Sequence, residues 1–222
     1  DPNSDIPTDY IESKNINEIP LRIFKNSIHL GADANILRGL EIAESDWVYL
    51  LGDSKIPTHN AFDRMINDIK NNKNIASVIY QSKNVNLKSI VIDDINGISN
   101  NSLYFGDLLL VGNSVISKEV INSYYSVASQ LTMTRSILPI FHILALKDNK
   151  KLLVSNNNII EEFIEKPDHY NPGLSLIECW AQFPLLANLP INNDEKKSIV
   201  RNIINNDNLK DRILFYKFCL LK

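Results

Sequence analysis

Apolar positions along this chain follow two different spacings, which together predict an α/β fold. Residues 32–43 and 58–69 carry apolar side chains three and four positions apart, the spacing of helices that cover a sheet. Further helices are predicted from about Ser117, over 133–146 and over 194–204. Short apolar runs bounded by Gly, Asn or Asp predict strands instead. These runs lie at 47–51, 75–80, 89–93, 151–154 and 159–164, and the last two are predicted to form a strand pair.

This alternation of helices and buried strands favours one domain over residues 1–170, with a mostly parallel central sheet flanked by helices. Residues 171–222 are predicted to form a C-terminal helical extension packed on that domain. The formal net charge is -3, with 23 basic residues scattered along the chain, so nucleic acid is not an expected partner. No apolar run reaches the ~18 residues of a membrane span. The isolated Cys179 and Cys219 suit a reducing, cytoplasmic compartment.

The most informative segment runs from Asn26 to Asp53 and predicts a glycine turn, a helix, a buried strand and then a carboxylate. Asp53 follows Gly52 directly, so it is expected at the carboxyl end of the strand. Ligands of open α/β sheets bind at that end. The alternative is that Asp53 only forms a turn or caps a helix, as aspartates at strand ends often do.

This segment resembles inverting family 2 glycosyltransferases of the GT-A fold, a Rossmann-like fold, and especially bacterial O-antigen and capsule enzymes. The family pattern is Asn, Gly, Asn, a helix and Leu-Gly-Asp-Asp-Asp. Residues 26–69 are similar to it through four elements, which are Asn26, Gly31, Asn35 and 51–53. The opening residues resemble the family's Asp-Asn-x-Ser-x-Asp loop through Asp1, Asn3 and Asp5. The resemblance implies that these residues bind a nucleotide-sugar donor.

The chain departs from that family pattern after Asp53. Lys55 stands where the family has the last acidic residue of an Asp-x-Asp element, which would ligate Mg²⁺ or Mn²⁺ on the donor diphosphate, and Ser54 takes the middle position. A charged ammonium cannot bind a metal. Either Asp53 alone holds a loosely bound metal, or Lys55 itself offsets the charge that develops on the leaving diphosphate. A weakened or inactive enzyme is the third outcome.

The chain also begins inside a family motif, without the first strand and its Pro-Thr-Tyr-Asn segment, which normally holds the nucleotide base. Either the sequence is a fragment of a longer protein, which we favour, or the nucleotide is bound differently.

An inverting transfer also needs a general base for the acceptor hydroxyl, and two residues are candidates. Asp107 lies where the resembling enzymes face the acceptor, but it could be a solvated edge residue. His142 lies in an apolar helix and could titrate near neutral pH, but such a histidine could equally be a hydrogen-bonded core residue.

The leading function is therefore transfer of a sugar from a nucleotide-diphosphate donor to a cell-surface glycan, with a saccharide or lipid-linked acceptor. Residues 209–221, apolar and basic, could contact the inner face of a membrane. The alternative is a catalytically decayed subunit that binds or scaffolds glycans, as Lys55 suggests. A nucleotidyltransferase ranks third because the sequence lacks the glycine-rich phosphate loop of that class.

Overall fold

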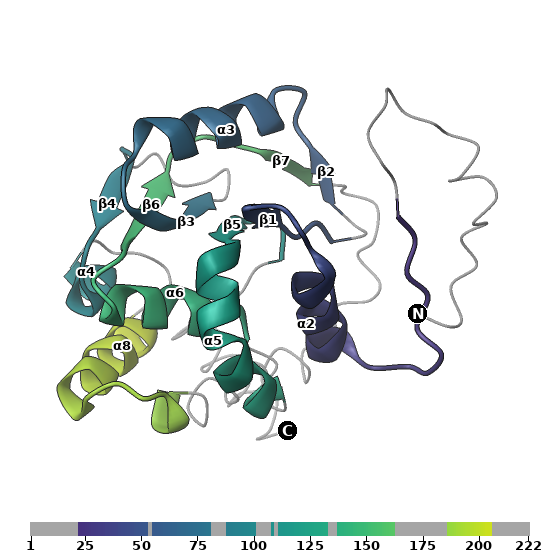
Figure 1. Cartoon of the computed structure of the whole chain (residues 1–222). Helices are drawn as coiled ribbons and strands as arrows, with labels where there is room; N and C mark the ends of the chain where they lie inside the picture. The colour runs from purple at the N-terminus through teal and green to yellow at the C-terminus, as the bar shows by residue number, and fades with distance from the viewer. Residues whose placement is uncertain are drawn as a thin grey trace, which may run out of the picture.

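The computed structural model describes residues 22–52, 55–80, 88–100, 108, 111–132, 137–162 and 186–205, and it is an α/β structure (Figure 1). A five-stranded sheet has the order β1-β5-β3-β6-β4, and a second, two-stranded sheet pairs β2 with β7. The strands are β1 (Trp47–Tyr49), β2 (Lys55–Pro57), β3 (Ile75–Tyr80), β4 (Ile90–Ile92), β5 (Ser114–Ser117), β6 (Lys151–Ser155) and β7 (Ile160–Glu162).

The prediction of a mostly parallel sheet is wrong for these strands. Neighbours β3 and β6 are parallel, whereas β1–β5, β5–β3 and β6–β4 are antiparallel. The prediction failed because β5, four residues between Gly112-Asn113 and a helix, was not recognised as a strand. All four of its residues are buried, and it separates β1 from β3. Non-adjacent β1, β3 and β6 still run in one direction, which follows from their pairings.

The predicted pairing of the strands near 151–154 and 159–164 is also wrong. β6 lies inside the main sheet, and β7 pairs antiparallel with β2, with Lys55 opposite Glu162 and Pro57 opposite Ile160. The four-residue loop 156–159 carries the chain from one sheet to the other. Apolar runs alone do not reveal which strand each run pairs with.

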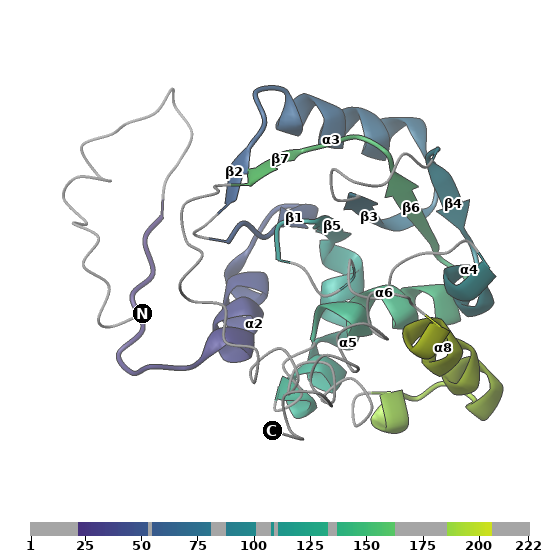
Figure 2. The ribbon, with the colours of Figure 1, turned by 180° about the vertical axis from the view of Figure 1, so that it is seen from behind.

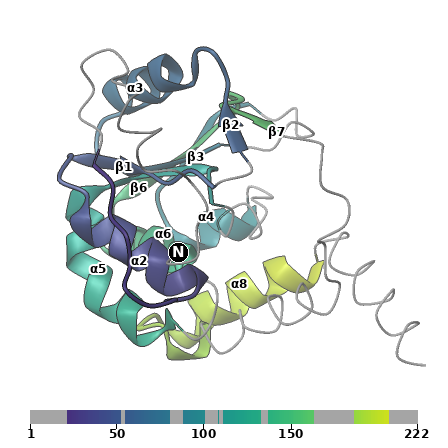
Figure 3. The same cartoon turned by 90° about the vertical axis from the view of Figure 1, so that its right-hand side faces the viewer.

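The helices of the described ranges divide unequally between the two faces of the main sheet (Figures 2 and 3). One face, here called the large face, is covered by five of these helices, and the other, the small face, by α3 and the β2–β7 pair. The large-face helices are α2 (Ala32–Ile42), α4 (Ile95–Asn100), α5 (Lys118–Gln130), α6 (Leu138–Lys147) and α8 (Asn193–Asn205), and α3 spans Ala61–Asn71. Each face has its own apolar cluster.

The large-face core centres on α6, whose residues from Leu138 to Leu146 are all buried. A helix that is apolar on every side is stable only when it is covered on every side. The main sheet, α5 and α4 contact it. Ile199 of α8 is fully buried in the same cluster, and α8 packs against α4. The predicted C-terminal extension therefore contributes at least α8 to the main core, although its boundary at residue 170 lies outside the described residues.

Helix α3 on the small face buries fewer of its apolar side chains than the sequence predicts. Ala61 and Met65 are buried against the sheet, but Phe62 is 60% exposed and Ile66 is 47% exposed. Consecutive helix positions are about 100° apart, and here the line of residues 61 and 65 faces the sheet while the line of residues 62 and 66 lies toward solvent. Within the described part of the chain, none of the helices combines the length and the apolar composition that crossing a bilayer requires.

Candidate functional site

One edge of the main sheet collects the ends of its three co-directional strands. Tyr80 ends β3 and Ser155 ends β6, and the two are register partners. The antiparallel β5 begins at the same edge, since Ser114 lies opposite Ile79 and the backbone N–H of Tyr80 donates to the carbonyl oxygen of Asn113 at 2.7 Å. Ligands of open α/β sheets bind at the carboxyl ends of such strands.

A hydrogen bond joins Gly52 and Lys55 at this edge. The backbone N–H of Lys55 donates to the carbonyl oxygen of Gly52 at 3.1 Å, and Lys55 then begins β2. Asp53, the predicted donor-binding and metal-binding residue, and Ser54, a predicted donor-binding residue, lie outside the described residues.

The stem of Lys55 is bordered by two glycines that are distant in sequence. A Cβ added at Gly52 would lie 3.9 Å from Lys55 Cγ, and one at Gly112 would lie 3.7 Å from the same atom. Gly112 has a φ of +96°, a backbone conformation that other residues rarely adopt. We call Gly52, Lys55 and Gly112 the glycine corner. A Cβ at Gly112 would also lie 2.9 Å from Ile160 Cδ1 of β7, so side chains of β2 and β7 pack directly against this glycine.

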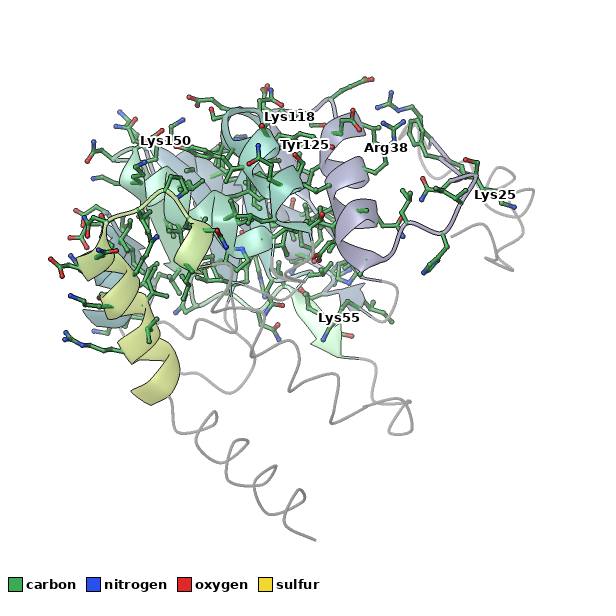
Figure 4. The ribbon with its side chains drawn as sticks, turned by 90° about the horizontal axis from the view of Figure 1, so that it is seen from below. Lys25, Arg38, Lys55, Lys118, Tyr125 and Lys150 are labelled. Carbon is green, nitrogen blue, oxygen red and sulfur yellow. The ribbon has the colours of Figure 1, made fainter. Side chains whose placement is uncertain are left out.

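Lys55 is half-buried and set apart from other basic side chains. Figure 4 shows it beside the β2–β7 pair, well away from Arg38, Lys118 and Lys150 on the helical surface. Lys150 forms an ion pair of 2.5 Å with Glu119, and Lys118 Nζ donates to the carbonyl oxygen of Leu40 at 2.6 Å. Those two lysines therefore have structural partners on the opposite side of the molecule.

The other predicted donor-binding residues that the structure describes lie at the start of α2. Gly31 is the residue before the helix, with φ 79° and ψ 171°, a conformation essentially limited to glycine. Asn35 Oδ1 accepts a hydrogen bond of 2.6 Å from Asn26 Nδ2. Two of the residues that carry the family resemblance therefore tie the segment before α2 to the helix. This asparagine pair belongs to the large-face side of the chain, and the glycine corner lies beside the β2–β7 pair.

The structure places His142 in the core, away from the edge. The residue is fully buried, and its Nδ1 lies 2.9 Å from Ser77 Oγ of β3. Its Nε2 meets no hydrogen-bonding partner among the described residues. Burial lowers the pKa of His142 to about 3. A neutral imidazole sealed from solvent cannot reach an acceptor hydroxyl, so we leave His142 out of the proposed site.

The small face holds a polar network that the sequence pattern did not reveal. Asp68 of α3 accepts hydrogen bonds from Ser155 Oγ at 2.8 Å and from Asn157 Nδ2 at 3.0 Å. Arg64 of the same helix donates to the carbonyl oxygen of Asn158 at 2.5 Å. These bonds fix the loop 156–159 and, through it, β7. Four-residue spacing between Arg64 and Asp68 was the only sequence signal that could have revealed the network.

Two tyrosines lie near this network on the small face. Burial raises the pKa of Tyr49 to about 12. Burial, followed by the nearby charge of Asp68, raises the pKa of Tyr80. Both phenols therefore stay protonated at neutral pH and do not serve as general bases.

The described residues do not supply a ligand set for a metal ion. In the ranges that the structure covers, no three acidic, His or Cys side chains gather closely enough to hold one. Lys55, an acidic position in the resembling family, carries an ammonium that does not ligate metals. The remaining predicted site residues, Asp1, Asn3, Asp5 and Asp107, lie outside the described residues.

Comparison with known proteins does not assign this chain to a family. No protein-family model matches this chain, and no curated protein sequence matches it significantly. The α/β fold with its mixed sheet is the class that the structure defines.

Proposed function

We propose that this protein is an inverting glycosyltransferase that moves a sugar from a nucleotide-diphosphate donor to a cell-surface glycan. The observation that carries the proposal is the glycine corner, at the edge where β1, β3 and β6 end. This is where α/β proteins bind phosphate-containing ligands. The resemblance of residues 26–69 to family 2 enzymes supports the same interpretation. GT-A architecture, a cytoplasmic location and contact with the inner membrane face through residues 209–221 belong to this proposal.

In the proposed mechanism, Lys55 lies at the diphosphate and offsets the charge that develops as the bond to the sugar breaks. A lysine acts on a phosphate as a point charge, and its stabilisation is largest where that charge develops. Asp107 takes the proton of the acceptor hydroxyl as its oxygen attacks the anomeric carbon. Asp53, with Gly31 and Asn35, contributes to donor binding.

Calorimetry with the full chain tests the donor site. UDP-, GDP-, CMP- and dTDP-sugars are titrated separately, and one class is expected to bind. Lys55→Met should weaken that binding by roughly 10- to 100-fold, the usual worth of a charged hydrogen bond. Lys150→Met is the matched control, because Lys150 pairs with Glu119 on the opposite surface, and it should bind as the unmodified chain does.

The same titrations separate the two ways of holding the diphosphate. Binding that survives EDTA but is lost in Lys55→Met supports the lysine. Binding that requires added Mg²⁺ or Mn²⁺ and is lost in Asp53→Ala supports a metal held by Asp53. Hydrolysis of the donor without acceptor, lost in Asp53→Ala, would extend the result from binding to chemistry. Full activity of that variant would remove Asp53 from the reaction.

A glycan-binding or scaffolding subunit on a decayed transferase fold is the second candidate. Lys55 favours it, because the residue replaces an acidic position of the resembling family. Absence of binding by all four donor classes, together with measurable binding of an oligosaccharide, would establish this alternative.

A further inference from the structure

Helix α3 forms the outer layer of the small face and presents apolar side chains to solvent (Figures 1 and 3). Phe62 is 60% exposed and Ile66 is 47% exposed, and residues four positions apart lie on one side of a helix. Ile69 continues this side and is only partly buried. We call Phe62, Ile66 and Ile69 the α3 line. The ring of Phe62 packs edge to face on Tyr49 of β1, with 6.4 Å between the ring centroids, so the fold itself fixes its position.

Two opposite charges flank the α3 line on the side that faces away from the sheet. Asp63 and Lys70 are both exposed, and they lie about two helical turns apart on the same flank of α3. Asp63 belongs to the first turn of the helix and Lys70 to its last turn, so each also suits the helix dipole at its own end. Within the part of the chain that the structure describes, neither residue forms an ion pair.

A second copy of α3, running antiparallel to the first, complements this pattern. A two-fold axis beside Ile66 places Ile66 against its own copy and Phe62 against Ile69 of the second copy. The same register places Asp63 of each copy beside Lys70 of the other. The apolar positions and the charged positions therefore select one common register, and the symmetry forms the ion pair twice.

We propose that the α3 line is the interface of a weak homodimer in which two copies of α3 pack antiparallel. This inference does not depend on the proposed donor site. The helix has 11 residues and is therefore about 16 Å long, so this contact buries less than the roughly 1,600 Å² of a standard interface. The dimer should form reversibly, with a Kd on the order of 10–100 µM. Asp63 beside the line disfavours an anionic lipid surface as the occupant.

Sedimentation velocity of the full chain at low ionic strength tests for the dimer. The weight-average sedimentation coefficient should rise between about 5 and 500 µM, the range that spans such a Kd. Ile66→Asp should weaken association by about tenfold or more, because the two-fold axis brings the two introduced carboxylates together. Val91→Asp is the matched control, because Val91 is 46% exposed on β4, at the edge of the sheet opposite to β1. That variant should associate as the unmodified chain does.

Charge reversal tests the antiparallel register. Asp63→Lys and Lys70→Asp each replace two attractions by two repulsions, so each variant alone should associate about tenfold more weakly. An equimolar mixture of the two variants should recover the affinity of the unmodified chain, because every contact between positions 63 and 70 then joins opposite charges. If the two charges served only the helix dipole, mixing would rescue nothing.

Folding is measured separately from association. Far-UV circular dichroism of every variant at about 2 µM, well below the expected Kd, should match that of the unmodified chain. If Ile66→Asp does not fold, Phe62→Ala replaces it. A chain that stays monomeric up to about 500 µM overturns the proposal, as does a mixture that associates no better than its two components. Cosedimentation of that monomeric chain with vesicles of anionic phospholipid would assign the α3 line to a lipid surface instead.

Discussion

The two faces of the main sheet are built in different ways. On the large face, the five described helices bury a continuous apolar cluster, and α6, buried from Leu138 to Leu146, contributes seven of its side chains. On the small face, the apolar cluster is much smaller, and α3 is anchored by hydrogen bonds from Asp68 and Arg64 to the loop 156–159.

This difference indicates which face carries stability and which carries the candidate site. Apolar burial stabilises in proportion to area and specifies little about individual side chains. Hydrogen bonds specify particular positions, and on the small face they hold the loop that leads into β7, the pairing partner of the strand that begins with Lys55. We therefore expect core substitutions to act mainly on folding and small-face substitutions to act on both folding and donor binding.

The largest expected effect is loss of an aromatic ring from the large-face core. Phe141 of α6 is fully buried, so Phe141→Ala should lower the free energy of unfolding by about 3–5 kcal/mol through lost burial and a residual cavity. Phe62→Ala on α3 is the matched control, because Phe62 is 60% exposed. Urea unfolding of both variants measures the difference. Equal losses would contradict the assignment of the main core to the large face.

Lowering the pH should reduce the free energy of unfolding, because His142 is buried in its neutral form in the large-face core. Burial lowers the pKa of His142 to about 3 from its ordinary 6.5. Below pH 6.5 the unfolded chain binds a proton that the folded chain does not, so this contribution is complete above pH 6.5 and is lost as the pH falls toward 3. The loss should be about 2 kcal/mol between pH 6.5 and pH 5, at about 1.4 kcal/mol per pH unit.

Unfolding free energies of the unmodified chain and of the His142→Leu variant across this range measure that contribution. The comparison uses the slopes with pH, because the substitution by leucine also removes the hydrogen bond to Ser77 and shifts stability at every pH. Identical slopes would show that His142 is not buried in its neutral form.

On the small face, Asp68→Ala should cost about 1–2 kcal/mol. The substitution leaves the buried hydroxyl of Ser155 without its acceptor, and an unsatisfied buried polar group carries a desolvation cost of that order. Asn67→Ala, at an exposed neighbouring position on the same helix, is the control and should change stability by less than about 0.5 kcal/mol. If Asp68→Ala also weakens donor binding, the network helps to place the β2–β7 pair.

The spacing of apolar residues in the sequence predicted the helices α2 and α6 of the large face. The apolar spacing of residues 32–43 and the apolar run 133–146 correspond to α2 and to α6 in its described part. Burial on all sides leaves a strong signal in composition, because no run of polar positions interrupts it. The same signal placed His142 in an apolar helix, and its core interpretation is the one that the structure supports.

The sequence was less informative about the small face and the sheet order. Strand β5 is short and half serine, and its pairing between β1 and β3 depends on contacts between segments more than 30 residues apart. The close contact that a side chain at Gly112 would make comes from Ile160 of β7, about 50 residues later in the chain. Local patterns carry no record of such distant partners, so the glycine corner could be recognised only in three dimensions.

The smallest expected effect concerns a polar group on the large face. Asn192 precedes α8 and its Oδ1 accepts hydrogen bonds from the backbone N–H groups of Asp194 and Glu195, while Glu195 Oε2 accepts one of 2.8 Å from the backbone N–H of Asn192. This reciprocal cap is worth about 1 kcal/mol. Asn192→Ala should therefore cost less than Asp68→Ala, since apolar contacts of Ile199 also hold α8 in place.

Hydrogen exchange of the α8 amides provides the local measurement for this cap. Asn192→Ala should speed exchange in the first turn of α8 and leave α3 unchanged, and Glu195→Gln, which keeps an oxygen acceptor, should have a smaller effect. A loss larger than that of Asp68→Ala would reverse the comparison of the faces. Polar groups would then stabilise the large face as strongly as its buried side chains do, and the division between a folding face and a binding face would not hold.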